Sequence, residues 1–512
     1  MPPATSIPAD PPEATPAPRR SYGQIVKSSA LIGGSSVISI GFGMVRNKAM
    51  ALLIGTHGVG LFGLYNRVYD VTRSLAGMGI NNSGVRQIAE AVGSQDAQRI
   101  ARTVTTLRRV AFGTGALGGL LLLMLCWPVS WLTFKDSAHA GPIALMALAV
   151  FFADVSAGQA ALVQGMRRIA DLARMNIWGA LFGTVFSIPI IYFFREEGVV
   201  PSLVIVAAMG ILTSWWYARK VRVEPVAMTL REIFSETSGL LRMGFVFMAS
   251  GLMTTGVAYL VGVILARKLD LDAVGSYQAA WNVGGVYFGY ILQAMGADFY
   301  PRLTAVAHDN SECSRLVNEQ VEIGLLLAGP GVLATLVFAP LVIPLFYSRD
   351  FGPAVEVLRW LCLGMMLRVV SWPMGFILVA KGLANWFFWT ELIGNLLQVG
   401  LIWFGVLVFG LNGTGMAFFG LYVIYTLGIY LVVRRLSQFR WSNANRRLGL
   451  LFLLLVAIVF SSRYLLDRSL AAILGALITV LASVFSLRTL CALIPMDRLP
   501  KPVGKLLRRF SS

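Results

Sequence analysis

Charged residues are scarce in this chain, since only 13% of its 512 residues are Asp, Glu, Lys or Arg and 56% are hydrophobic. A soluble protein carries about 25% charged residues, so this composition excludes an ordinary water-soluble domain. The mean hydropathy of +0.71 instead predicts an all-α polytopic membrane protein.

Residues that serve as metal ligands or nucleophiles are also few. The four cysteines have no CxxC or other metal-binding spacing, and the three histidines form no cluster. The sequence contains no phosphate-binding glycine loop and no nucleophile elbow. We therefore expect no metal, no cofactor and no enzymatic activity.

The apolar runs predict about 14 transmembrane helices, at about 20 residues for each crossing. Helices 1–6 form a predicted N-lobe over residues 29–217, and helices 7–12 form a C-lobe over 243–433. We expect these two six-helix lobes to surround a central cavity, with two C-terminal helices added over 448–491.

Four further segments lie outside the predicted spans, and their composition sets the expected topology. They are a proline-rich, disordered tail over 1–28, a linker over 218–242 with an amphipathic helix, a basic loop over 434–447 and a basic tail over 492–512. We expect all four to be cytoplasmic.

The net charge of +18 arises from short loops rather than from one basic surface. Of the 43 Lys and Arg, 30 fall in the predicted cytoplasmic segments and seven on the opposite side: Lys135, Arg195, Arg267, Lys268, Arg349, Arg463 and Arg468. The positive-inside rule then places both termini in the cytoplasm and excludes nucleic acid as the partner.

A weak internal repeat joins the two predicted lobes. The segment Gly58–Tyr65 is similar to Asp272–Tyr277, and Ala76–Gly79 is similar to Gln293–Gly296, at an offset of about 215 residues. An offset of six spans relates the halves by an axis along the membrane normal, as in secondary transporters with a site between two lobes.

Four cations fall inside or against the first two predicted spans: Arg46, Lys48, Arg67 and Arg73. Charge in hydrocarbon costs about 2.5–3.5 kcal/mol per residue on insertion scales, so the cluster predicts a water-filled cavity that binds an anion. Arg67, Asp70 and Arg73 share one helical stripe, and arginine suits bidentate phosphate contacts. The alternative is an ion-pair ladder that fixes helix packing.

Three more intramembrane positions are candidates for function. Arg368 is a partner site in the second half, and Asp154, with Asp70, is a candidate for binding a coupling proton or sodium ion. Pro373 lies mid-span and is a candidate hinge for alternating access. The alternatives are a packing carboxylate and a static kink.

The chain resembles bacterial Wzx-type translocases of O-antigen or enterobacterial common antigen, within the multidrug/oligosaccharidyl-lipid/polysaccharide exporter superfamily. The resemblance covers residues 30–110 and rests on Val45–Ala49, Leu53–Gly55, Gly58–Tyr65, Ala76–Ile80 and Val85–Glu90. Lipid II flippases are also similar, with intramembrane arginines to which Arg46 and Arg73 correspond, and with two more spans than many Wzx-type proteins.

The resemblance implies a flippase that moves undecaprenyl-diphosphate-linked oligosaccharide from the inner to the outer leaflet of the bacterial cytoplasmic membrane. Its expected partners are that lipid, membrane lipids, a proton or sodium ion and a polysaccharide polymerase complex. An ion-coupled small-molecule exporter and a membrane-integral polymerase or ligase remain alternatives. An exporter of cationic drugs favours acidic cavities, and a polymerase needs catalytic residues on substantial external loops.

Overall fold

The computed structural model describes residues 19–221, 223, 226 and 228–493, so most of the two terminal tails predicted above lies outside the described residues. Within the described part the chain is helical and contains no strand. The α-helices are α1 Arg19–Ala76, α2 Ile80–Gly93, α3 Ala97–Met124, α4 Cys126–Phe134, α5 Ala140–Gly165, α6 Ile169–Phe194, α7 Val199–Ala218, α8 Leu230–Lys268, α9 Leu271–Ala305, α10 Asn310–Phe346, α11 Ala354–Ala380, α12 Ala384–Phe409, α13 Asn412–Ser437, α14 Asn443–Leu465 and α15 Arg468–Leu493. Two short 3-10 helices, η1 Arg195–Gly198 and η2 Arg349–Phe351, complete the set.

Eleven segments of the described chain are long and apolar enough to cross a membrane, so the protein is a multi-pass membrane protein. Two of them, Gly33–Ala76 and Ile169–Ala218, are 44 and 50 residues long. At about 1.5 Å per residue, each is roughly twice as long as one crossing of a 30 Å hydrocarbon core requires. The predicted number of 14 spans stays a prediction.

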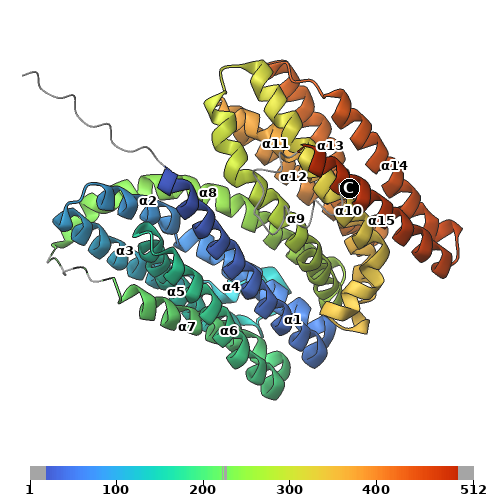
Figure 1. The fold of residues 1–512 in the computed structure, drawn as a ribbon. Coiled ribbons are helices and arrows are strands. Elements are labelled where there is room, and N and C mark those ends of the chain that lie inside the picture. The colour runs from blue at the N-terminus through green and yellow to red at the C-terminus, as the bar shows by residue number, and fades with distance from the viewer. Residues whose placement is uncertain (1–18, 222, 224–225, 227, 494–512) are drawn as a thin grey trace, which may run out of the picture.

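The first long segment folds back on itself at Gly55. Gly55 has φ 64° and ψ −162° within α1, a conformation that side-chain-bearing residues rarely adopt. The two limbs of α1 run in opposite directions from this point (Figure 1). The break falls between the first two predicted spans. We use "Gly55 end" for this end of the molecule.

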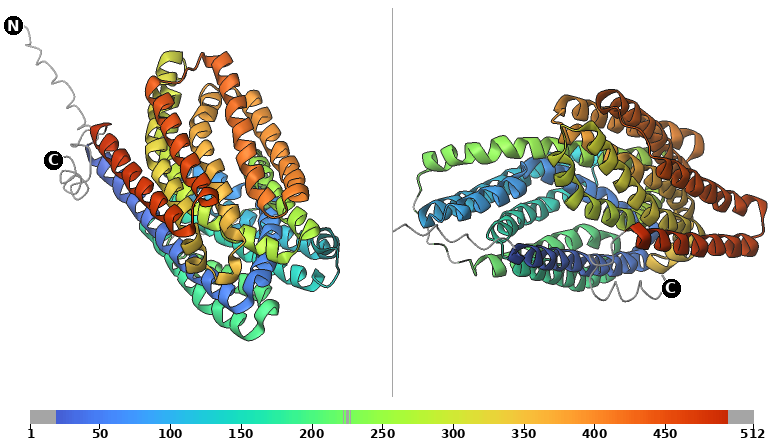
Figure 2. Two further views of the ribbon diagram at one scale, coloured as in Figure 1. Left: turned by 90° about the vertical axis from the view of Figure 1, so that its right-hand side faces the viewer. Right: turned by 45° about the horizontal axis from the view of Figure 1, so that its top comes forward.

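The helices form two groups with α8 and α9 between them (Figures 1 and 2). In the first group, α1 packs on α6, and α5 packs on α3 and α7. In the second, α11 packs on α10 and α13, and α14 and α15 pack on α10. Helix α8 contacts α1 and α12, and α9 contacts α1 and α11, so these two helices connect the groups.

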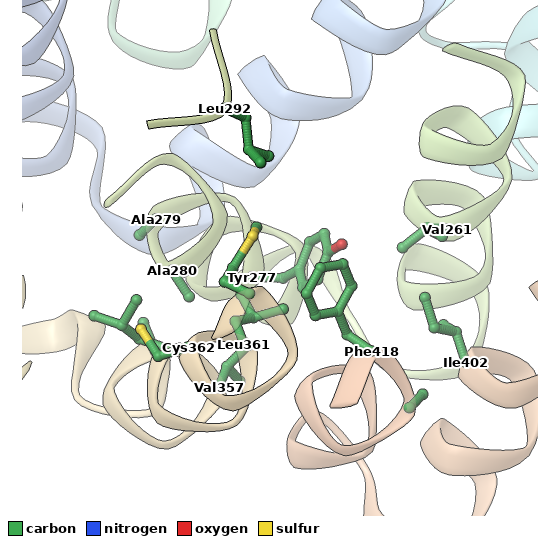
Figure 3. Close-up of a cluster of buried hydrophobic side chains, with 14 of the residues drawn as sticks. Val261, Tyr277, Ala279, Ala280, Leu292, Val357, Leu361, Cys362, Ile402 and Phe418 are labelled. Carbon is green, nitrogen blue, oxygen red and sulfur yellow. The ribbon is translucent and has the colours of Figure 1, made fainter. Parts of the chain in front are cut away.

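The apolar core of the second group gathers where α9, α11 and α13 meet. Tyr277, Leu361 and Phe418 pack together there, next to the buried thiol of Cys362 (Figure 3). This packing holds α9 firmly against the second group.

The predicted linker helix is the start of α8 rather than a separate element. The Thr229 side chain accepts a hydrogen bond from the Glu232 amide, and the Thr229 amide donates to the Glu232 carboxylate, which forms a capping box. The hydrogen bonds that the Thr229 amide and hydroxyl donate to the Glu232 carboxylate lower the pKa of Glu232. The helix then continues without a break to Lys268.

A reciprocal contact between α1 and α9 gives the internal repeat a structural counterpart. A Cβ added to Gly60 would lie 1.9 Å from the carbonyl oxygen of Leu271, and a Cβ added to Gly275 would lie 2.1 Å from that of Thr56. Gly60 and Gly275, and likewise Thr56 and Leu271, are separated by the repeat offset. Gly60 thus packs on Leu271, and the equivalent residue Gly275 packs on Thr56, which is the equivalent of Leu271. Such a reciprocal contact is typical of a two-fold axis.

Candidate functional site

A cavity of about 280 Å³ lies among α1, α2, α3, α5 and α8. Its charged lining residues within the described part of the chain are Asp70, Arg73 and Asp154, and its polar ones include Asn81 and Thr114. The second limb of α1 ends here because Met78 and Gly79 adopt left-handed conformations before α2 begins. We call this space the first cavity.

Arg73 and Asp154 form an ion pair across the first cavity. The Arg73 Nε lies 3.5 Å from Asp154 Oδ1, and the two side chains are 40% and 4% exposed. The second oxygen of Asp154 is buried and has no hydrogen-bond partner within the described chain. Arg73 therefore presents its guanidinium to the cavity while one carboxylate oxygen is left unsatisfied.

Asp70 lines the same cavity, but its hydrogen-bond partner is not one of the two arginines on its helical stripe, Arg67 and Arg73. Its carboxylate accepts a hydrogen bond of 3.1 Å from Asn66, and no ion pair joins it to either arginine within the described residues. Asp70, Arg73 and Asp154 together carry a net charge of −1 when all are ionised. The described lining of the first cavity thus has no excess of positive charge, although the four cations in the first two spans predicted an anion-binding cavity.

Arg67 lies apart from the first cavity, at the junction between α1, α8 and α9. Its side chain donates a 3.1 Å hydrogen bond to Gln278 and lies 5.5 Å from the Tyr277 ring centre. The Arg67 Nη1 is buried without a described partner, and a Cβ added to Gly262 would lie 2.2 Å from it. Arg67 is therefore a buried cation with which no carboxylate of the described residues forms an ion pair.

Arg46 and Lys48 lie nearer the Gly55 end. Arg46 stacks 5.6 Å from the Phe62 ring centre, and its Nε is buried without a described partner. The Lys48 ammonium donates to the backbone carbonyls of Pro344, at 2.7 Å, and Tyr347 at the end of α10. Lys48 thus ties the first limb of α1 to the second group.

Arg73 and Arg67 lie on the second limb of α1, and Arg46, on the first limb, stacks on Phe62 of the second. Arg67 lies six residues, or about 9 Å, from Arg73 towards Gly55, and Phe62, on which Arg46 stacks, lies about 7.5 Å further. Guanidinium groups thus follow each other from the first cavity towards the Gly55 end. We call these three residues the arginine ladder.

A second cavity of about 310 Å³ lies among α11, α12 and α13. Arg368 and Glu391 line it. The lining also contains two amide side chains, Asn395 and Gln398, and several aromatic rings, among them Trp372, Phe376, Tyr422 and Tyr425. The Tyr425 hydroxyl donates a 2.9 Å hydrogen bond to Glu391. Sequence analysis missed the amides and rings because single polar and aromatic residues in apolar spans carry no motif.

Pro373 lies in α11, beside the wall of the second cavity. The helix continues through it from Ala354 to Ala380, and Pro373 itself is buried. The role of Pro373 as a hinge therefore stays a prediction.

The two helix groups are joined by several polar contacts near the Gly55 end. Besides Lys48, Thr56 donates a hydrogen bond to Asp272, and Asn282 donates one of 3.1 Å to the Tyr347 hydroxyl. These contacts surround the crossing of α1 and α9 at Gly60 and Gly275. The molecule is therefore held together at this end.

Proteins of known sequence and structure are similar to this chain over most of its length. It is 24% identical to the lipid III flippase of Escherichia coli K12 over 420 residues, which are 80% of this chain and 99% of that protein. It is 21% identical to the lipopolysaccharide biosynthesis protein WzxC of the same organism, over 78% of each chain.

Solved structures share the fold at lower identity. The lipid II flippase MurJ in an inward closed conformation superposes with a TM-score of 0.70 at 13% identity, over 90% of this chain and all of MurJ. An inward-facing multidrug transporter of the MATE family superposes with a TM-score of 0.67 at 15% identity, over 78% of this chain and 94% of that one. A family profile described as polysaccharide biosynthesis protein matches residues 49–356, and the chain belongs to that family.

Proposed function

We propose that this protein is a flippase that carries an undecaprenyl-diphosphate-linked oligosaccharide from the inner to the outer leaflet of the bacterial cytoplasmic membrane. It is a transporter and not an enzyme. The observation that carries the proposal is the arginine ladder, which begins in a cavity and follows α1 towards the Gly55 end. The similarity to the lipid III flippase supports the choice of substrate class.

A diphosphate alone in hydrocarbon would cost tens of kcal/mol by Born solvation, so its path needs fixed cations. Arg73 offers the first of these, and Arg67 and Arg46 each hold a buried guanidinium nitrogen without a described partner. Phosphate oxygens would satisfy such nitrogens with charge-assisted hydrogen bonds. We therefore assign the diphosphate to these three arginines in sequence.

Charge balance connects this path to ion coupling. Because Asp70 and Asp154 outnumber Arg73 in the first cavity, a bound diphosphate needs an additional cation there. A proton or a sodium ion at Asp154 would supply it and would release Arg73 from its ion pair. We propose Asp154 as the coupling residue and Asp70 as its neighbour.

The second cavity suits the glycan. Aromatic rings and amides, such as Trp372, Tyr422 and Asn395, offer apolar faces and hydrogen bonds in a largely apolar wall. Arg368 adds one cation to this cavity. The two cavities together would hold the two chemically different parts of one substrate, with the polyprenyl tail in lipid.

In this proposal the first and second helix groups are the N-lobe and the C-lobe, and their relative movement gives alternating access. The contacts at the Gly55 end close one side, and the loops rich in Arg and Lys at the opposite end lie in the cytoplasm by the positive-inside rule. The interior-negative potential favours outward movement of an anion by about 2.3 kcal/mol per charge per 100 mV. A polysaccharide polymerase complex would receive the product outside.

Reconstitution in liposomes tests this function. Fluorescent undecaprenyl-diphosphate oligosaccharide placed in one leaflet should lose its asymmetry at a rate proportional to the amount of protein. A parallel assay of drug-dependent proton exchange covers the exporter alternative. Drug-dependent exchange without lipid flipping across several glycans would reject the flippase and favour the exporter.

A further inference from the structure

A third cavity, of about 710 Å³, lies between the α14–α15 hairpin and helices α10 and α11. It lies at the Gly55 end, because α10 and α14 finish there and α11 and α15 begin there. Its charged lining residues are Glu356, Arg359, Arg463 and Arg468. No part of the proposed transport path uses it.

Three arginines and one glutamate line this cavity. Glu356 forms ion pairs with Arg359, at 2.7 Å, and with Arg463. No described carboxylate forms an ion pair with Arg468, which lies exposed on the rim. The lining therefore carries two positive charges in excess.

The inner part of the cluster is poorly hydrated. The side chains of Arg359 and Arg463 are each 15% exposed. The Arg463 Nε is buried and has no hydrogen-bond partner within the described residues. An excess of buried guanidinium charge is stabilised by an anion, and phosphate matches its geometry.

Apart from Ser462 and Tyr464, the remaining described lining of the cavity is apolar, and it continues onto the outer surface of α10. Leu336, Phe338, Leu341 and Phe460 line it, and the side chains of Phe338 and Leu341 are exposed. In a multi-pass membrane protein such exposed side chains face lipid tails. The ligand that fits therefore has an anionic phosphate at the membrane surface and acyl chains beside it.

We propose that this cavity binds the headgroup phosphate of an anionic glycerophospholipid, with phosphatidylglycerol as its simplest form. The phosphate lies between Arg463 and Arg468, and the acyl chains lie along α10. Among the described residues, α14 and α15 make extensive contacts with one other helix, which is α10. The ion pair between Arg463 and Glu356 connects the hairpin to α11 as well, beside the proposed phosphate position.

Lipid binding to the purified full-length protein tests the proposal. The probe is fluorescent phosphatidylglycerol, titrated in detergent and compared with fluorescent phosphatidylcholine. Arg468→Gln removes only an exposed rim charge, so this variant should fold and bind phosphatidylglycerol about threefold more weakly. Arg468→Lys should restore most of the binding, and Arg195→Gln, at the same end in the first group, is the matched control.

A second variant neutralises the buried part of the cluster, and it removes one negative and two positive charges together. Glu356→Gln, Arg359→Gln and Arg463→Gln together should weaken phosphatidylglycerol binding about tenfold or more and leave phosphatidylcholine binding unchanged.

Three results would overturn the proposal. These are equal affinity of the native protein for the two lipids, unchanged phosphatidylglycerol affinity in Arg468→Gln, and displacement of phosphatidylglycerol by undecaprenyl phosphate at a lower concentration than by unlabelled phosphatidylglycerol. The last result would assign the site to the carrier lipid of the transport reaction.

Discussion

The two repeats share a backbone contact but not their charges. Gly60 and Gly275 occupy equivalent places at the crossing of α1 and α9. After its glycine the first repeat continues to Arg67, Asp70 and Arg73, whereas residues 282–290 of the second repeat contain no charged residue. The charged segment is thus present in the first repeat alone, although the glycine contact is present in both.

The cavities of the two groups differ in the same way. They are similar in size, at about 280 and 310 Å³, but an ion pair lines the first, whereas rings and amides surround Arg368 and Glu391 in the second. The duplicated scaffold has therefore become specialised, with an ion pair as the main polar group of one cavity and mostly aromatic and amide side chains in the other. Such a division suits a substrate with a charged diphosphate and a neutral glycan.

Reversing the charge of Arg73 should break this division most strongly. Arg73→Glu places three carboxylates in the first cavity, so we expect lipid flipping to fall about 100-fold or more. Loss of leaflet asymmetry in liposomes at matched protein density measures it. Arg349→Glu, on an exposed turn of η2, is the control and should flip normally. Normal flipping by Arg73→Glu would remove Arg73 from the path.

Neutralising Asp154 should separate ion coupling from substrate binding. Asp154→Asn frees Arg73 from its ion pair, so binding of the diphosphate lipid should become about tenfold tighter while flipping loses its dependence on an ion gradient. Affinity measurements and flipping with an imposed proton or sodium gradient test the two parts. Unchanged affinity together with normal gradient dependence would leave the carboxylate a packing role.

The reciprocal crossing predicts equal effects at two positions far apart in sequence. Gly60→Ala and Gly275→Ala each place a methyl group against a backbone carbonyl, so each should destabilise the closed Gly55 end by about 1–3 kcal/mol. Cross-linking of cysteines introduced on either side of α1 and α9 reports the closure. Gly256→Ala, where the added Cβ meets nothing within 4 Å, is the control. A large effect at only one of the two glycines would contradict the symmetric contact.

The smallest expected effect is in the second cavity. Trp372→Ala removes a ring from its wall and should slow flipping of glycan-bearing lipid about threefold to tenfold. Undecaprenyl diphosphate without sugars should flip at the native rate in this variant. Equal slowing of both lipids would show that the ring acts through packing and would end the assignment of this cavity to the glycan.

Much of the fold follows from local patterns in the sequence. Apolar runs predict the spans, the repeat predicts the relation between Gly60 and Gly275, and the loop after the first run contains Gly55, where α1 reverses. Each of these signals depends on residues close together in the chain or on a constant offset. Such signals can be read without knowledge of which helices are neighbours in the tertiary structure.

The site depended on contacts that no local pattern contains. Arg73 pairs with Asp154 on another helix rather than with Asp70 three residues away. Lys48 contacts backbone carbonyls of α10, nearly 300 residues further along the chain. Spacing places side chains on one helix face, but the neighbouring helices decide which of them meet, and only the structure shows those neighbours.

The central claim is that the arginine ladder recognises the diphosphate, and the native protein tests it with two lipids. Flipping rates of undecaprenyl-diphosphate oligosaccharide and of an uncharged polyprenol-linked oligosaccharide with the same glycan should be measured in the same liposomes. We predict rapid flipping of the diphosphate lipid alone, and loss of this preference in Arg73→Gln. Equal rates for the two lipids in the native protein would contradict the account.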